Sequence, residues 1–323
     1  MKCPEITNEE TKPLGTTRGG FQSDSTSGVE TFSYLRFGFG LDSQPFQSPS
    51  DNPPPAVGVH CKTETYYTMR RIILLIAMLI SVQIFGQESD KIDFTKEIQK
   101  FDISDLLTLE RFNIENDTVV VPRQHPLGFI GENFQRFHIR LISVIRNPNN
   151  PLEYFVFGKT KVKENICVFQ GKLTVEKSML FKESEIPELK QGLVNGSYEF
   201  YEDPDQNGTG VFKGKFHTFF YISEKGELKY DALMWGADGF ENNQFEGNWT
   251  SYKTGASKKC NWGDYRIPDS NDLDCGAGEF GPDSKYEKYG WENYRLAWVY
   301  SSSRPGVDEA RKKENEKWWI DKE

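Results

Sequence analysis

Phe169-Gln-Gly171-Lys-Leu173, Phe212-Lys-Gly214-Lys-Phe216 and Phe245-Glu-Gly247-Asn-Trp249 repeat one pattern, Phe-x-Gly-x-large apolar, in a chain of 323 residues. Alternate side chains of a β-strand share a face, so each repeat places its phenylalanine, glycine and second apolar residue together. Glycine weakens a strand unless the fold needs a bulge, a sharp bend or the close approach of another group. The repeats therefore predict a strongly coiled sheet that closes on itself. Its glycines either form corners of a packed barrel or sandwich, or make room for a ligand inside it.

The residues around these repeats carry further strand signals. Phe137, Ile139 and Leu141 alternate with polar residues, which is typical of a half-buried strand. Further strands are predicted over 152–157, 160–170, 171–177, 197–202, 211–223, 227–235 and 245–253. The short connections between several of them require antiparallel neighbours. We predict a mainly β domain over 128–304, an antiparallel barrel or barrel-like sandwich of about 8–10 strands.

The segment 87–127 is predicted to be a helical lead-in to this domain. Phe94, Ile98 and Phe101 recur at helical spacing and indicate a short amphipathic helix. Ser104 has the chemistry of an N-cap for a second short helix, because its hydroxyl can accept a hydrogen bond from a free backbone N–H group.

A C-terminal helix is predicted over 305–323. Acidic residues precede basic ones in this segment, which is the order that the helix dipole favours. The apolar stripe is thin, so we expect this helix to pack through Trp318, Trp319 and Ile320.

Residues 69–86 have the sequence of a secretory signal peptide. Two arginines follow Met69, an apolar run comes next, and a small residue precedes the expected cleavage site at Gln87. The apolar stretch over 72–85 contains Ser81 and Gln83, whereas a transmembrane helix needs about 20 apolar residues. An uncleaved signal-anchor transmembrane helix is the alternative. We expect a secreted or periplasmic protein, or a membrane-anchored one with its C-terminal domain exported, in which only this segment contacts the membrane.

Residues 1–68 are predicted to be a disordered leader or an over-extended start whose true initiator is Met69. Gly, Ser, Thr and Pro supply 30 of these 68 positions, and no apolar periodicity persists. Such a composition buries too little apolar surface to offset the conformational entropy of the chain.

The overall charge argues against one class of partner. The chain has 48 acidic and 39 basic residues, and no block of Lys and Arg. Nucleic-acid binding needs a basic surface, so we expect no nucleic-acid partner.

Three cysteines lie in the exported part. Cys260 and Cys275 enclose 14 residues, and a disulfide between them would contribute about 3 kcal/mol in an oxidising compartment. Cys167 lies in an apolar strand pattern and is expected to be a buried free thiol.

The segment 260–291 is the strongest candidate for a binding site. It is rich in Gly, Asp and aromatic residues, lacks strand alternation and is too long for a hairpin turn. Aromatic rings beside carboxylates suit sugars, which present C–H faces and hydroxyl groups. The candidate ligand-binding residues are Trp262, Asp264, Tyr265, Arg266, Asp274, Glu279 and Trp291. The alternative is a structural loop that covers the sheet and buries its own aromatic residues.

Two other kinds of chemistry have weaker signals. Asp264 and Glu279 are the candidates for a catalytic carboxylate pair of the glycosidase type. Asp203, Asp205 and Asn207 match the first half of a calcium loop, but Gly214 replaces the bidentate Glu at its twelfth position. A hairpin turn is the favoured interpretation of these three residues, and no other cofactor is expected.

Three classes of function follow from these patterns. A non-catalytic binding module for a glycan or a small amphipathic ligand is the first. A secreted hydrolase acting on a polysaccharide or an ester is the second, and a structural envelope protein without a ligand is the third. Both ligand hypotheses require that Trp262, Asp264, Glu279 and Trp291 converge on one cleft.

Overall fold

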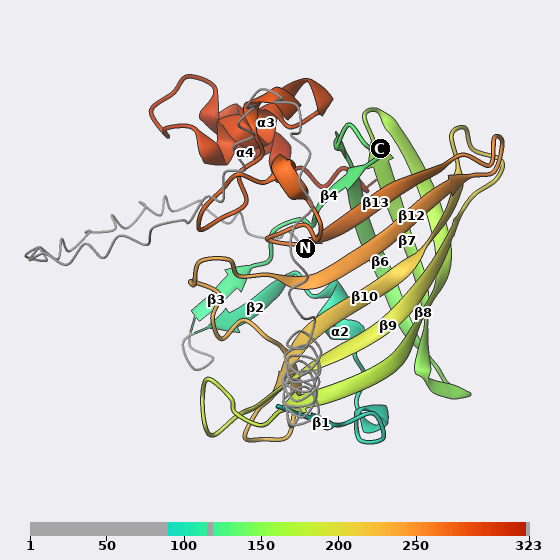
Figure 1. The fold of residues 1–323 in the computed structure, drawn as a ribbon, viewed down its shortest axis with the longest axis vertical. Helices are drawn as coiled ribbons and strands as arrows, with labels where there is room; N and C mark the ends of the chain where they lie inside the picture. The colour runs from blue at the N-terminus through green and yellow to red at the C-terminus, as the bar shows by residue number, and fades with distance from the viewer. Residues whose placement is uncertain (1–89, 115–118, 321–323) are drawn as a thin grey trace, which may run out of the picture. The chain divides into compact units, whose positions relative to one another are not determined.

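The computed structural model describes residues 90–114 and 119–320, and the predicted leader over 1–68 and signal segment over 69–86 lie outside the described residues. Nine antiparallel strands follow one another along a single curled sheet (Figure 1). In spatial order they are β5 (Gln135–Arg136), β4 (Leu127–Ile130), β13 (Ser257–Asp264), β12 (Asn242–Ser251), β10 (Gly210–Ile222), β9 (Lys190–Glu202), β8 (Asn165–Phe181), β7 (Asn150–Val162) and β6 (His138–Asn147). The remaining strands are β1 (Lys91–Asp93) on β8, β11 (Leu228–Tyr230) on β10, and the separate hairpin of β2 (Arg111–Ile114) and β3 (Val119–Pro122).

The two ends of this path meet at one residue, Phe137. Arg136 in β5 pairs with Phe129 in β4, whereas His138 in β6 pairs with Lys161 in β7. Between them, the backbone N–H of Phe137 donates to the carbonyl oxygen of Gly128 at 2.9 Å. The continuous segment that contains β5 and β6 therefore pairs with β4 at one end of the path and with β7 at the other. The prediction of a mainly β, antiparallel and barrel-like fold is confirmed, and its form is a curled half-barrel.

Two predicted strand boundaries are wrong. The strands expected at 160–170 and 171–177 are parts of β7 and β8, because the chain turns at Lys163, which has a positive φ of 54°. The strand expected over 227–235 ends at Tyr230, because the carboxylate of Asp231 accepts hydrogen bonds from the Gln191 side chain and the Leu233 backbone and starts a turn there.

The helices are short. Before the sheet lie the 3-10 turn η1 (Ile98–Lys100) and α2 (Ser104–Thr108), and after it lie η2 (Asn271–Leu273), η3 (Ser284–Tyr289), α3 (Glu292–Tyr294), the π-helical turn η4 (Arg295–Val299) and α4 (Val307–Glu314). Ser104 is the first residue of α2 rather than its N-cap, which is Ile103, and the Ser104 N–H group donates to Oδ1 of Asp102 at 2.9 Å. The predicted C-terminal helix stops at Glu314, before the two tryptophans. Within residues 90–114 and 119–320, no helix has both the length and the apolar character needed to cross a membrane.

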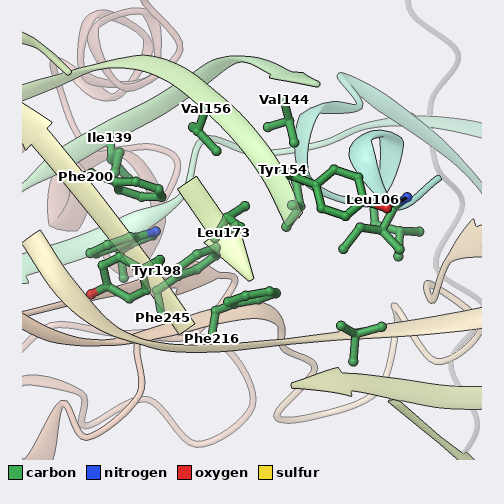
Figure 2. Packing of buried hydrophobic residues seen from close by; sticks show 14 of the residues in the cluster. Leu106, Ile139, Val144, Tyr154, Val156, Leu173, Tyr198, Phe200, Phe216 and Phe245 are labelled. Atoms are coloured by element: carbon green, nitrogen blue, oxygen red, sulfur yellow. Dashed lines mark hydrogen bonds between the residues drawn. The ribbon is translucent and has the colours of Figure 1, made fainter. Parts of the chain in front are cut away.

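Aromatic side chains from neighbouring strands fill the inside of the sheet and explain its glycines. A Cβ atom at Gly196 would overlap the ring of Phe216, and one at Gly214 or Gly247 would overlap the hydroxyl of Tyr198. Figure 2 shows Tyr198, Phe200, Phe216 and Phe245 packed together in this core. The glycines thus let large rings lie directly on the backbone of the next strand, which favours the packing interpretation of the repeated motif.

We expect Tyr198→Phe to leave the free energy of unfolding unchanged or to raise it by about 1 kcal/mol. The Tyr198 side chain is 3% exposed and its hydroxyl has no hydrogen-bond partner. Removing an unsatisfied buried hydroxyl leaves the ring contacts in place. Urea unfolding followed by circular dichroism measures the change.

The matched control is Tyr230→Phe, also in the core. The Tyr230 hydroxyl donates to the carboxylate of Asp264 at 3.0 Å, so its loss should lower stability by about 1.5–3 kcal/mol. A destabilised Tyr198→Phe protein would show that the hydroxyl has a partner that the geometry does not reveal.

The lead-in segment covers the concave side of the sheet. Leu106 and Leu107 of α2 are buried in the same core, and Figure 2 shows Leu106 beside Tyr154. The Tyr154 hydroxyl accepts a hydrogen bond from the backbone N–H of Ile103 at 3.3 Å. The short helix is therefore held by burial and by polar contacts to the strands, since a helix of five residues is not stable alone.

A second, smaller core lies on the other side of β4. Leu127 and Phe129 face this core, whereas Gly128 between them contacts Phe137 and Trp262 of the first core. The second core is completed by residues from the segment after β13, namely Ile267, Leu273, Phe280, Tyr286, Trp291 and Tyr294. Because alternate side chains of a strand lie on opposite faces, β4 faces one core on each side and separates the two.

The chain after α4 lies across the strands that close the sheet. Trp319 packs edge-on against His125, with ring centres 4.9 Å apart, and Trp318 lies 6.0 Å from His138. Arg140 lies over the ring of Trp319 at 4.8 Å. The expected packing through the two tryptophans is present, although it comes from an irregular segment, and Ile320 is exposed.

We expect the protein to lose stability as the pH falls below about 6.5, with His138 as a principal cause. Burial, together with the charges of Arg136 and Lys161, lowers the pKa of His138 well below its ordinary value, and burial also lowers the pKa of His125. The unfolded chain then binds more protons than the folded one below the ordinary histidine pKa. Each such histidine contributes a slope of at most about 1.4 kcal/mol per pH unit.

Thermal unfolding of the wild type and of His138→Gln between pH 7.5 and pH 5 checks this expectation. The difference in stability between the two proteins should shrink or reverse as the pH falls, because glutamine does not titrate. Parallel curves would mean that His138 keeps its ordinary pKa.

Candidate functional site

Asp264 is the centre of a buried polar network at the end of β13. Its side chain is 1% exposed, and its Oδ1 atom accepts a hydrogen bond from Arg123 Nη2 at 2.8 Å. Its Oδ2 atom accepts from the Tyr230 hydroxyl at 3.0 Å and from Asn243 Nδ2 at 2.8 Å. Burial and the neighbouring carboxylate raise the pKa of Tyr230 well above its ordinary value, so this hydroxyl stays a donor.

This network joins the lead-in to the sheet. Arg123 also donates to the carbonyl oxygens of Leu107 and Leu109, and Asn243 donates to that of Leu106 at 2.9 Å. The cavity beside Asp264 has a volume of only about 20 Å³, which holds no more than a water molecule. Both oxygens of Asp264 are occupied, so the geometry assigns it a structural role and does not favour a general acid or base.

Arg266 and Asp274 form a clamp that shapes the loop after β13. The Arg266 guanidinium contacts the Asp274 carboxylate and donates to the carbonyl oxygen of Gly278 at 2.6 Å. Asp274 Oδ1 accepts from the backbone N–H groups of Gly276 and Gly281, each at 3.0 Å. These two candidate residues therefore hold the loop in place.

The four residues that both ligand hypotheses require do not share one cleft, so neither hypothesis keeps the site predicted for it, and any ligand site has to lie elsewhere. Trp262 is 2% exposed and belongs to the first core, whereas Trp291 is fully buried in the second. The Trp291 indole N–H donates to the carbonyl oxygen of Phe134 at 2.7 Å, and Arg136 covers its ring at 4.1 Å. For Trp262 and Trp291, the structure agrees with the alternative that the segment 260–291 buries its own aromatic residues.

Three of the seven candidates do line one cleft, which we call the aromatic cleft. It has a volume of about 330 Å³ and contains Tyr265, Arg266 and Glu279. Its other side-chain walls are the aromatic residues Trp235, Phe240, Phe280, Tyr294 and Trp298 and the polar residues Gln124 and Asp238. Six aromatic residues thus line the aromatic cleft, and two carboxylates stand among them.

Two loops build this cleft. The backbone N–H of Gly239 donates to the carbonyl oxygen of Gly278 at 2.8 Å, which ties the loop after β11 to the loop after β13. A Cβ atom at Gly278 would lie 2.6 Å from Oδ1 of Asp238, so the two loops approach each other closely at this point. Contacts between these two loops therefore form the aromatic cleft.

Tyr265 has an unusual backbone at this point. Its φ angle is +63°, a region that bulky residues rarely occupy, and such strain amounts to about 1–3 kcal/mol. The strained backbone places the ring in the cleft wall, packed edge-on against Phe240 at 5.1 Å. Burial and the nearby Asp264 raise the pKa of Tyr265, so its hydroxyl is protonated at neutral pH. Strain of this kind concentrates at binding sites, which supports the cleft as a functional feature.

Trp235, Phe240 and Trp298 are wall residues that the sequence did not single out. Trp235 was expected in a strand, and Trp298 lies beyond the segment 260–291. The sequence Trp235-Gly-Ala-Asp-Gly is a turn signal rather than a strand signal. That signal, together with the position of all seven tryptophans at or after residue 235, could have identified the first of them.

The expected disulfide between Cys260 and Cys275 is absent, and both cysteines are free. Cys260 faces the first core from β13 and is 0% exposed. Cys275 lies in the outer loop, where its thiol contacts the carbonyl oxygen of Gly281 at 3.2 Å. The inward direction of the Cys260 side chain keeps the two thiols apart. Cys167 is buried and free, as predicted.

The proposed calcium loop is the turn between β9 and β10. Asp203 Oδ1 accepts a hydrogen bond from the backbone N–H of Asp205 at 3.0 Å, and the carbonyl oxygen of Asn207 accepts from Asn165. These contacts are typical of an Asx turn in a hairpin, which is the interpretation that the sequence favoured. Among the described residues, no three His, Cys, Asp or Glu side chains lie together as metal ligands.

Similarity to other proteins does not identify a ligand. No family model, curated protein or solved structure matches the chain. The chemistry of the aromatic cleft is therefore inferred from its lining residues.

Proposed function

We propose that this protein is a non-catalytic binding module for a glycan or a small amphipathic ligand, and that the aromatic cleft holds the ligand. The observation that carries the proposal is a cleft of about 330 Å³ lined by six aromatic side chains, with Asp238 and Glu279 among them. A volume of this size lies at the lower end of the range for small-molecule sites. Rings offer flat apolar faces to sugar C–H groups, and carboxylates accept hydrogen bonds from hydroxyl groups.

Exposure within the cleft supports a ligand that enters from solvent. Trp298 is 41% exposed, and the side chains of Asp238 and Glu279 are also exposed, so all three are accessible. Asp274 and the loop carbonyl groups hold Arg266 in place, which keeps this part of the aromatic cleft in a fixed shape. A preformed site loses less entropy when a ligand binds.

A glycan array and a panel of amphipathic small molecules, read out by direct binding and by tryptophan fluorescence, test the proposal. For any ligand that binds the wild type, Trp298→Ala should weaken binding at least about tenfold, because an exposed tryptophan in a binding site is a typical hot spot. Glu279→Gln should weaken binding of hydroxyl-bearing ligands. The control is Tyr252→Ala, since Tyr252 is 43% exposed and lies outside the cleft.

Two outcomes contradict the proposal. If the folded wild type binds no member of either panel, a structural envelope protein becomes the better description. If binding occurs but Trp298→Ala and Tyr252→Ala behave alike, the ligand binds elsewhere. Turnover of a bound polysaccharide or ester would instead support the hydrolase hypothesis, for which the occupied oxygens of Asp264 give no support.

Export is the second part of the proposal. Its support is the sequence of residues 69–86, with a charged start, an apolar run and a small residue before Gln87. Cell fractionation should find the native protein outside the cytoplasm. Recovery of the protein in the cytoplasmic fraction alone would contradict this part.

A further inference from the structure

A second and larger cleft lies next to the aromatic cleft. It has a volume of about 940 Å³, and we call it the hairpin cleft because the turn between β10 and β11 forms one of its sides. Trp235 and Gly236 line both clefts, so one short stretch of chain is the wall between them. Any ligand long enough to pass over this wall contacts both clefts at once.

The wall has open space above its backbone and is supported by packing. The ring of Trp235 packs edge-on against Phe112 at 6.2 Å, which fixes the tryptophan from below. At Gly236, an added Cβ atom would meet nothing within 4 Å, so the space above the backbone is open. A tryptophan beside an open glycine gives a flat apolar surface over which a chain can lie.

The charges around the two clefts disfavour an anionic ligand. The hairpin cleft is lined by two acidic residues, Glu188 and Glu224, and by two basic ones, Lys225 and Lys229, so the charges balance. In the aromatic cleft, Asp238 and Glu279 face the ligand, while the one cation is paired with Asp274. An anionic ligand would be repelled by the exposed carboxylates, whereas hydroxyl groups can donate to them.

The hairpin cleft also combines apolar and polar side chains. Ile186, Leu189 and Leu233 supply apolar surface, and Asn113 and Ser223 supply neutral hydrogen-bonding groups. A ligand with alternating C–H faces and hydroxyl groups matches both clefts, whereas one with a single apolar end matches only one of them.

We infer that the ligand is a neutral, linear oligosaccharide that runs from the aromatic cleft over Trp235 and Gly236 into the hairpin cleft. The inference rests on the proposed function of the aromatic cleft and specifies its ligand class. Sugar units in the two clefts belong to one chain, so their binding energies reinforce each other without the entropy loss of a second association.

Length series of neutral gluco-, xylo-, manno- and chito-oligosaccharides, from one to eight units, test the inference by isothermal titration calorimetry. In the series that binds, affinity should rise at least tenfold from the shortest ligand that binds to the longest. Gly236→Leu should abolish most of this gain by obstructing the path between the two clefts, whereas Tyr252→Ala, outside both clefts, should leave the affinities of the whole series unchanged. The glycine has no positive φ and an open Cβ position, so leucine is compatible with the fold.

Gly236→Ala is the matched control, because alanine is smaller than leucine and obstructs the path between the two clefts less. This variant should keep most of the gain in affinity with length. Affinity that does not change with length, or Gly236→Leu lowering short and long ligands equally, would overturn the inference while leaving the proposed function intact. The same holds if only amphipathic molecules or acidic glycans bind through Trp298. If no ligand of any panel binds, the inference and the proposed function fail together.

Discussion

Asp264→Asn lowers the free energy of unfolding by about 3–5 kcal/mol, the loss expected when one partner of a buried ion pair is removed. Asparagine has nearly the same shape, so the loss reports the charge rather than a cavity. The Arg123 guanidinium, whose side chain is 6% exposed, would remain buried without its carboxylate. Tyr230 and Asn243 both donate to Oδ2 of Asp264, so both would also lose a charged acceptor. Chemical denaturation followed by circular dichroism measures the effect.

Asp269→Asn is the matched control for this variant. Asp269 also belongs to the segment after β13 and pairs with Lys259, but its side chain is 50% exposed. Exposed pairs contribute little, so the control should stay within about 0.5 kcal/mol of the wild type. Equal effects of the two substitutions would remove the basis for a structural network at Asp264.

Trp262→Ala has an effect of similar size, about 3–5 kcal/mol, for a different reason. The Trp262 ring is stacked on Phe245, with centres 4.9 Å apart, and packs edge-on against Tyr198 at 5.1 Å. The side chain is 2% exposed, so alanine would leave a large cavity in the first core. Thermal and denaturant unfolding measure the loss.

Trp298→Ala provides the comparison, since its ring is 41% exposed. We expect a change in stability below about 1 kcal/mol for this variant, although it should affect ligand binding more. The pair separates two roles of tryptophan in the same part of the chain. A stable Trp262→Ala protein would mean that the core can collapse around the missing ring.

The regular part of the fold was predictable from sequence because it depends on local patterns. The alternation around Ile139 and the repeats at Gly171, Gly214 and Gly247 all lie in strands, as expected. Strand β13 overlaps the start of the segment 260–291, for which the sequence predicts a loop. Its inward residues Cys260 and Trp262 enter the first core, while Asn261 on the other face is covered and donates to the carbonyl oxygen of Pro268. A strand buried on both faces has no polar alternation to reveal it.

The candidate site was only partly predictable, because it depends on contacts between distant segments. Composition drew attention to Tyr265 and Glu279, which line the aromatic cleft, but it gave the same weight to Trp291, which is buried. Whether a tryptophan in this loop is buried depends on which core the loop covers. The spacing of residues along the sequence does not show this. Trp235 and Gln124 reach the cleft from other parts of the chain and carry no local sign of their role.

The strand order of the sheet combines hairpins between neighbouring segments with one long-range pairing. From β6 to β10, each strand pairs with the strand next to it in sequence, so these hairpins can form as the chain emerges from the ribosome. Strand β4 has to wait for β13, because Ile130 pairs with Cys260, about 130 residues later. Contacts this distant form late and slowly. The seam between β4 and β13 is thus the last part of the sheet to assemble, and a nascent chain that ends before it exposes an unpaired strand edge to aggregation.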